Sequence, residues 1–187
     1  MSPSQPPVIV VGAGPVGLLC ALELARRQVP VLVLETEPGT TLDLRAGTFH
    51  PPTLEMLQPE GVAEAMLEVG LKVRHWQSRD REYGLIAQWD LDLLRHDTPY
   101  PFRLHLEQHR LTPILLEKLQ AYEHAQVLFG HEFIELTQDG ERVRAVARHA
   151  RGQVEIEGSH LIGADGGRSA VRKSAGIEFE GYTWPER

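Results

Sequence analysis

Three glycines and one acid near the N-terminus are the residues whose types and spacing most clearly suggest a chemistry. Gly12, Gly14 and Gly17 form the pattern Gly-x-Gly-x-x-Gly, and Glu35 follows at the end of the next apolar run. In this pattern the glycines let the backbone approach a pyrophosphate, and the acid accepts hydrogen bonds from a ribose diol. These residues predict a dinucleotide site. FAD and NAD are the candidates, because Glu35 would repel the 2′-phosphate of NADP.

The sequence around these residues predicts the strand, helix and second strand that position them. A β-branched apolar run at 8–11 precedes the glycines, and leucines at helical spacing follow them. A second apolar run at 31–34 ends at Glu35. The N-terminus of the helix would present free N–H groups and the positive end of its dipole to the phosphates. The alternative is an ordinary strand–helix–strand turn without a ligand.

The middle and the C-terminal half of the chain predict several further elements. Helices are expected from Pro51, across 61–75 with a break at Gly70, and across 111–122, where Thr112 would cap the helix and Pro113 would begin it. Strands are expected at 85–89 and 103–106. Alternating segments at 131–138, 142–149 and 153–160 predict an antiparallel meander. A buried strand at 161–164 and a helix at 168–176 follow.

Three further positions have two interpretations each. Arg45 lies in a loop, where its cation could reach a pyrophosphate or could be an ordinary solvated arginine. Gln108 lies at the entrance to a helix, where it could face a ligand or cap the turn. Asp165 and Gly166 follow a buried strand, where the acid could face a nucleotide or cap the helix that follows.

Composition limits the class of protein. The 187 residues are 42% hydrophobic and suffice for one domain, and the net charge of −7 argues against a nucleic-acid partner. No apolar run reaches the roughly 18 residues of a membrane-spanning helix. We expect 1–7 to be a flexible leader without a signal peptide, and therefore a cytoplasmic location. The only cysteine, Cys20, excludes an intrachain disulfide, and the histidines, including His105 and His109, lack metal-ligand spacing, so no metal is expected.

Three stretches in this order resemble the single-component FAD-dependent aromatic hydroxylases, flavoprotein monooxygenases similar to 4-hydroxybenzoate hydroxylase. They are GAGPVG with Glu35, RAGTFHPPTLEML with EQHRLTPILLEKL, and LIGADGGRSAVRK, and the nearest branch is that of the phenol and 3-(3-hydroxyphenyl)propionate hydroxylases. The resemblance implies an α/β fold, a Rossmann-like FAD-binding domain with a parallel sheet and an antiparallel meander as its crossover. It implies these cofactor-binding residues: Gly12, Gly14, Pro15, Gly17, Glu35, Arg45, Gln108, Asp165 and Gly166.

The same resemblance implies a reaction. In the family NAD(P)H reduces the bound FAD, and molecular oxygen gives a flavin C4a-hydroperoxide that hydroxylates a phenolic or other aromatic substrate. Asp165 belongs to a family motif that is linked with NAD(P)H use. No catalytic residue is assigned.

The family's chains are at least twice as long, and their second FAD motif and most of their substrate sheet would lie beyond Trp184. We therefore expect 8–187 to be the N-terminal portion of the FAD-binding domain, with 76–104 a strand segment that joins a missing substrate domain. The alternative is a non-catalytic FAD-binding module, or a fragment completed by another chain. A homo-oligomer is a further expectation. An ordinary NAD-dependent oxidoreductase is disfavoured, because the LIGADG stretch and the meander have no place in a plain NAD domain.

Overall fold

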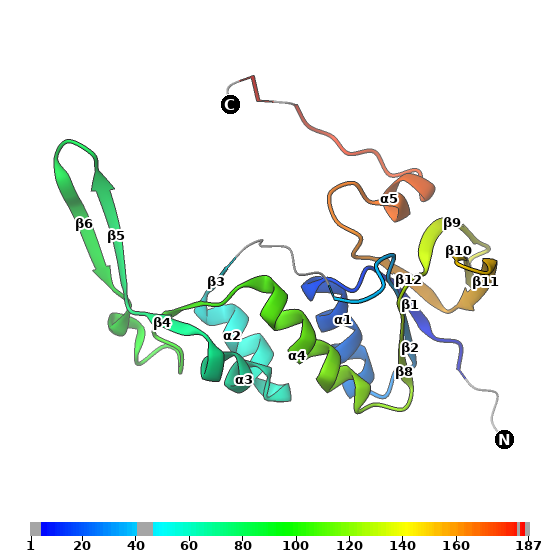
Figure 1. Cartoon of the computed structure of the whole chain (residues 1–187), viewed down its shortest axis with the longest axis horizontal. Helices are drawn as coiled ribbons and strands as arrows, with labels where there is room; N and C mark the ends of the chain where they lie inside the picture. Colours follow the sequence, from blue (N-terminus) through cyan, green and yellow to red (C-terminus); the bar gives the residue numbers. More distant parts are fainter. Residues whose placement is uncertain (1–4, 41–46, 183, 186–187) are drawn as a thin grey trace. The chain divides into compact units, whose positions relative to one another are not determined.

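The computed structural model describes residues 5–40, 47–182 and 184–185, and its contacts divide the chain into two compact units (Figure 1). The outer unit comprises Met1–Thr41 and Leu119–Arg187, and the middle unit comprises Leu42–Lys118. Each unit is described by itself. None of the helices among the described residues is long and apolar enough to cross a membrane.

A four-stranded parallel sheet forms the centre of the outer unit. Its order is β12-β1-β2-β8, with β1 at Val8–Val11, β2 at Val31–Leu34, β8 at Ala125–Leu128 and β12 at His160–Gly163. All four residues of β1 are buried, because the strand pairs on both sides and both of its faces are covered. The helix α1 (Pro15–Arg26) packs on β1 and β2 through an apolar face that includes Leu18 and Leu22.

An antiparallel sheet of three strands connects β8 to β12, where a helix would be usual. Its strands are β9 (Glu132–Gln138), β10 (Val143–His149) and β11 (Gly152–Gly158), in the order β11-β10-β9. The Asp139 carboxylate accepts hydrogen bonds from the N–H groups of Glu141 and Arg142 in the first turn, where Gly140 has a φ of +90°. The predicted meander and α/β fold are therefore confirmed.

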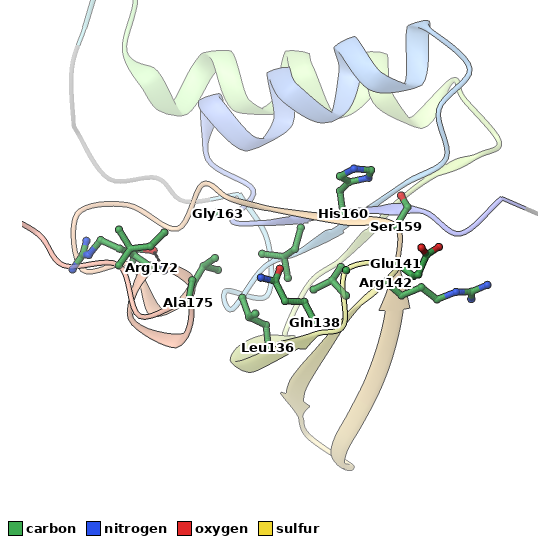
Figure 2. A pocket seen from close by; sticks show the side chains of 15 residues that line it. Leu136, Gln138, Glu141, Arg142, Ser159, His160, Gly163, Arg172 and Ala175 are labelled. Atoms are coloured by element: carbon green, nitrogen blue, oxygen red, sulfur yellow. Dashed lines mark hydrogen bonds between the residues drawn. The ribbon is translucent and has the colours of Figure 1, made fainter.

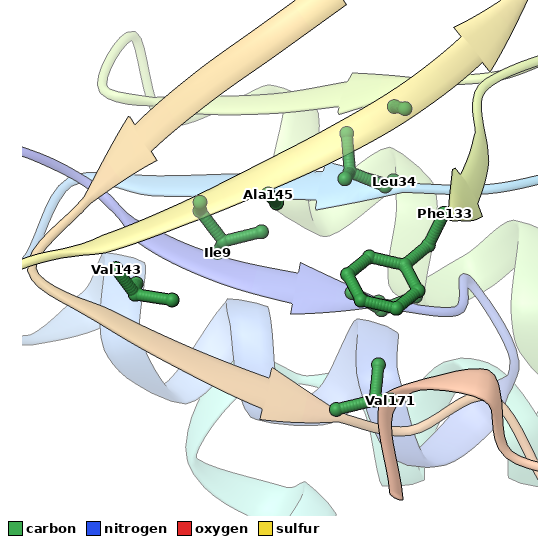
Figure 3. Close-up of a cluster of buried hydrophobic side chains, with 8 residues drawn as sticks. Ile9, Leu34, Phe133, Val143, Ala145 and Val171 are labelled. Atoms are coloured by element: carbon green, nitrogen blue, oxygen red, sulfur yellow. The ribbon is translucent and has the colours of Figure 1, made fainter. Parts of the chain in front are cut away.

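One apolar core joins the meander to the parallel sheet (Figure 3). Alternate residues of β10 face inward, because side chains of a strand point to opposite faces in turn. Phe133 from β9 and Val171 from the short helix α5 (Ala170–Ser174) complete the layer. The buried members of this core are Ile9, Val11, Leu34, Phe133, Val143, Ala145, Ala147 and Val171.

The middle unit contains a small antiparallel sheet with helices around it. The sheet order is β3-β7-β4, with β3 at Thr48–Phe49, β7 at Arg103–His105 and β4 at Leu71–Val73. The helices are α2 (Pro51–Leu57), α3 (Val62–Val69) and α4 (Gln108–Gln120), and 3-10 turns lie at Gln58–Glu60 and Leu91–Leu94. The side chains of Leu54, Leu57 and Val62 are buried, as their helical spacing indicates.

The middle unit also carries a two-stranded hairpin that consists of β5 (His75–Asp80) and β6 (Gly84–Asp90). No residue of either strand is buried. Trp76 and Trp89 lie opposite each other with ring centroids 5.0 Å apart. The predicted strand at 85–89 lies within β6.

Three local predictions need correction or completion. Helix α4 begins at Gln108, so Thr112 is not its cap and Pro113 lies inside it. The face predicted to be buried is confirmed, because Leu111, Leu115 and Leu119 are all buried. The helix predicted across 61–75 ends at Val69, and Leu71–Val73 forms strand β4 instead; strands β3 and β8 were not expected. Of the expected leader, residues 1–4 lie outside the described residues, and the carbonyl of Pro7 accepts a hydrogen bond from the N–H of Ser159.

Candidate cofactor site

The carboxyl ends of three neighbouring parallel strands place the predicted residues of the outer unit at one edge. Strand β1 lies between β12 and β2, and the three strands are in register. The glycine turn follows β1, Glu35 follows β2 and Asp165 follows β12. Backbone bonds extend this register into the turns, because the N–H of Gly12 donates to the carbonyl of Leu34 and that of Ala164 to Val11. This edge is where open α/β sheets bind ligands.

Gly12 and Gly17 are required by packing within the chain. Gly12 has a φ of +104°, and a Cβ there would lie 2.5 Å from the carbonyl oxygen of Ala164. A Cβ on Gly17 would overlap the carbonyl oxygen of Gly12 and lie 3.3 Å from the Cβ of Ala164. These two glycines therefore let α1 and the turn after β12 close on the end of β1.

Gly14 differs, because nothing in the described chain requires it. A Cβ at this position would meet no atom within 4 Å, and its φ of −71° suits any residue. Gly14 is the N-cap of α1, and Pro15, the first helical residue, has no N–H. Among the described residues, the N–H groups of Val16 and Gly17 have no acceptor. Open space next to free donors at a helix N-terminus suits a phosphate, so the turn fits the pyrophosphate of a dinucleotide.

Glu35 reaches from the end of β2 to the glycine turn. One oxygen of its carboxylate accepts a hydrogen bond from the N–H of Ala13 at 2.6 Å, and the other accepts one from the N–H of Glu37 at 2.9 Å. The side chain is half-buried. Each carboxylate oxygen has a second lone pair, so the group can still accept bonds from a ribose diol.

Asp165 caps the helix α5. Its carboxylate accepts hydrogen bonds from the Ser169 hydroxyl at 2.6 Å and from the N–H groups of Ala170 at 2.6 Å and Val171 at 3.1 Å. The Ser169 hydroxyl in turn accepts from the N–H of Arg172. Of the two interpretations of Asp165, capping is therefore present in the structure, and contact with a cofactor stays a prediction.

The other predicted residues are placed as follows. Gly166 forms the turn after Asp165 with a φ of +81° and open space around it. Gln108 is the first residue of α4 in the middle unit and is half-buried. Arg45 lies outside the described residues. The sequence analysis did not identify Ala13 or Ser169 as participants, although a serine four residues after an acid at a helix start is a capping signal.

The outer unit also contains a cavity of about 480 Å³ between the meander, β12 and α5 (Figure 2). Leu136, Leu161 and Val171 contribute to its apolar wall, and Arg142 and Arg172 lie at its margin. None of the eight predicted cofactor residues that the structure describes lines it, and no sequence pattern indicated it. The cavity is therefore separate from the site predicted at the glycine turn.

Comparison with known proteins agrees with this geometry. Residues 5–184 match the family model described as "FAD binding domain". The chain is 34% identical over 180 residues to para-nitrophenol 4-monooxygenase of Pseudomonas sp. strain WBC-3. The aligned region covers 96% of this chain and 45% of that protein. The chain belongs to the FAD binding domain family, and its relatives are FAD-dependent aromatic monooxygenases.

Solved structures of similar proteins have the same fold. The p-nitrophenol 4-monooxygenase PnpA of Pseudomonas putida DLL-E4 superposes with a TM-score of 0.92 at 33% identity, over 96% of this chain and 46% of that one. The flavin-dependent monooxygenase PieE, solved with FAD and substrate, has a TM-score of 0.84 at 30% identity, over 97% of this chain and 34% of that one. The chain therefore spans less than half the length of these relatives.

Proposed function

We propose that this chain is the FAD-binding portion of an NAD(P)H-dependent monooxygenase that hydroxylates a phenolic or other aromatic compound. The observation that carries the proposal is the N-terminus of α1, where N–H groups without an acceptor among the described residues and the open Gly14 lie at the same sheet edge as Glu35. Bound FAD would supply the chemistry that uses oxygen and electrons from NAD(P)H to hydroxylate an aromatic ring.

The chain's own residues would hold the adenosine diphosphate half of FAD. The N–H groups of Val16 and Gly17 would donate to the pyrophosphate, and Glu35 would accept bonds from the adenosine ribose. Asp165 would keep the turn at Gly166 in place through its bonds to α5. We propose that Arg45 and Gln108 also bind FAD, since both match family motifs.

The β5–β6 hairpin supports the proposal that a longer polypeptide completes a substrate domain. Trp76, Leu85, Ile86 and Trp89 are all 46% exposed or more. A hairpin of two strands alone is only marginally stable in water. Large apolar side chains exposed together mark a surface that further polypeptide covers. We propose that the segment 76–104 joins additional strands supplied by a C-terminal portion or by another chain.

The alternative is a FAD-binding module that is not catalytic alone, or a fragment completed by another chain. The test is to load the chain with FAD, add NADH or NADPH with a panel of phenols, and follow nicotinamide oxidation and product mass. Phenol-stimulated oxidation with a hydroxylated product supports a monooxygenase in this chain. FAD binding without that activity is the result expected both of a portion that needs further chain for turnover and of the module, and a folded chain that binds no FAD contradicts both.

A further inference from the structure

We infer that Glu35 is a positioning residue whose carboxylate holds the glycine turn in its binding conformation. Its carboxylate accepts a 2.6 Å hydrogen bond from the N–H of Ala13, which lies between Gly12 and Gly14. The consequence for FAD rests on the proposed function, whereas the positioning of the turn does not.

The backbone of Glu35 is itself fixed, so its carboxylate starts from a rigid base. The N–H of Glu35 donates to the carbonyl of Leu128, and its carbonyl accepts from the N–H of His131. The second carboxylate oxygen accepts from the N–H of Glu37 and sets the orientation of the group. The side chain therefore connects the end of β2 to the turn after β1 by a charge-assisted bond, which is stronger than a neutral one.

Because of the bond between Glu35 and Ala13, one N–H of the glycine turn is bound within the chain, and others face a possible ligand. The N–H of Ala13 donates to Glu35, whereas the N–H groups of Val16 and Gly17 have no acceptor in the described part of the chain and can donate to an anion. Loss of the carboxylate leaves the Ala13 N–H, in a residue only 5% exposed, without its acceptor. The turn would then rearrange, so one side chain couples the ribose-binding and phosphate-binding parts of the site.

The test uses NMR of the FAD-free chain. The Ala13 amide proton should resonate downfield in the native chain, as expected of an N–H that donates to a carboxylate at 2.6 Å. Glu35→Ala should remove that downfield shift, while Glu37→Ala, which removes a neighbouring acid and keeps the backbone donor, should preserve it. A native chain whose Ala13 amide proton is not shifted downfield overturns the inference without requiring a variant.

Hydrogen exchange supplies the second measurement. Glu35→Ala should accelerate exchange at the Ala13 amide by about tenfold or more, while the Gly12 amide, which donates to Leu34, stays protected. FAD titrations of the native chain and of the same variants distinguish the positioning role of Glu35 from the proposed FAD-binding function. If Ala13 responds as expected and the native chain binds no FAD, the proposed function fails and the positioning role stands. If FAD binds and Ala13 does not respond to Glu35→Ala, the positioning role is wrong.

Discussion

Gly14 and Gly17 have different surroundings, so an alanine at each position should affect a different property: stability at Gly17 and FAD affinity at Gly14. An alanine at Gly17 would place its methyl group against the backbone carbonyl of Gly12, which cannot rotate away. An alanine at Gly14 would meet no atom within 4 Å. The same chemical change, three residues apart in one motif, should therefore act on stability at one site and on ligand binding at the other.

The magnitudes follow from the geometry. Overpacking against a rigid neighbour costs about 1–3 kcal/mol, and alanine regains about 1 kcal/mol of helix propensity over glycine. Because the clash at Gly17 is with the backbone carbonyl of Gly12, which cannot move aside, we expect Gly17→Ala to lower the free energy of unfolding by about 2 kcal/mol. Gly14→Ala weakens only a helix cap, so we expect about 1 kcal/mol or less. Its methyl group would occupy the space beside the free N–H groups, so FAD affinity should fall about tenfold or more, or about 1.4 kcal/mol.

Urea unfolding followed by circular dichroism, together with FAD titration of each folded variant, measures both effects. The reasoning is refuted if Gly14→Ala destabilises the chain as much as Gly17→Ala does. Unchanged FAD affinity in Gly14→Ala would equally remove the pyrophosphate from this turn.

Three further outcomes are expected. Glu35→Ala should weaken FAD binding by about 1–3 kcal/mol through loss of a charged hydrogen bond, as measured by flavin fluorescence, and an unchanged dissociation constant would place Glu35 outside the site. Asp165→Ala should lower the free energy of unfolding by about 0.5–2 kcal/mol through loss of the α5 cap and weaken FAD retention or its reduction by NAD(P)H; unchanged values in all three assays would exclude both roles. Hydrogen bonding from Arg74 lowers the pKa of Asp90 from 3.8 to about 2, so its stabilising contribution to the hairpin is present above about pH 4 and is lost as the pH falls through 2. The fluorescence of Trp89, which lies next to Asp90 and against Trp76, should report that loss, and Asp90→Asn should not show this transition.

The elements with a clear local pattern were predictable from the sequence. The β-branched run before the glycines and the alternation in β9, β10 and β11 each indicate their structure without tertiary information. Strand β8 was missed because Ala125–Leu128 is short and shows no clear alternation, and its conformation depends on pairing with β2. The start of α4 was misplaced because the local pattern of Thr112 before Pro113 was interpreted as a helix start, whereas Pro113 lies inside a helix that begins at Gln108.

The candidate site was predictable in its residues and not in its internal contacts. The spacing of the glycines and Glu35 indicates which groups meet a ligand, because the motif is local and its strands are parallel. The bond between Glu35 and Ala13 joins residues 22 positions apart and depends on side-chain conformation, so no sequence pattern reveals it. For Asp165 the sequence left two roles open, and the hydrogen bonds to α5 establish the capping role.

The most direct test of the account is a titration of the purified chain with FAD, followed by quenching of flavin fluorescence and by competition with ADP. We predict a dissociation constant in the micromolar range or tighter. ADP should compete with FAD, because the residues at the ends of β1 and β2 would bind the adenosine diphosphate half of FAD. A chain that circular dichroism shows to be folded and that binds neither FAD nor ADP would contradict the claim that this sheet edge is a working cofactor site.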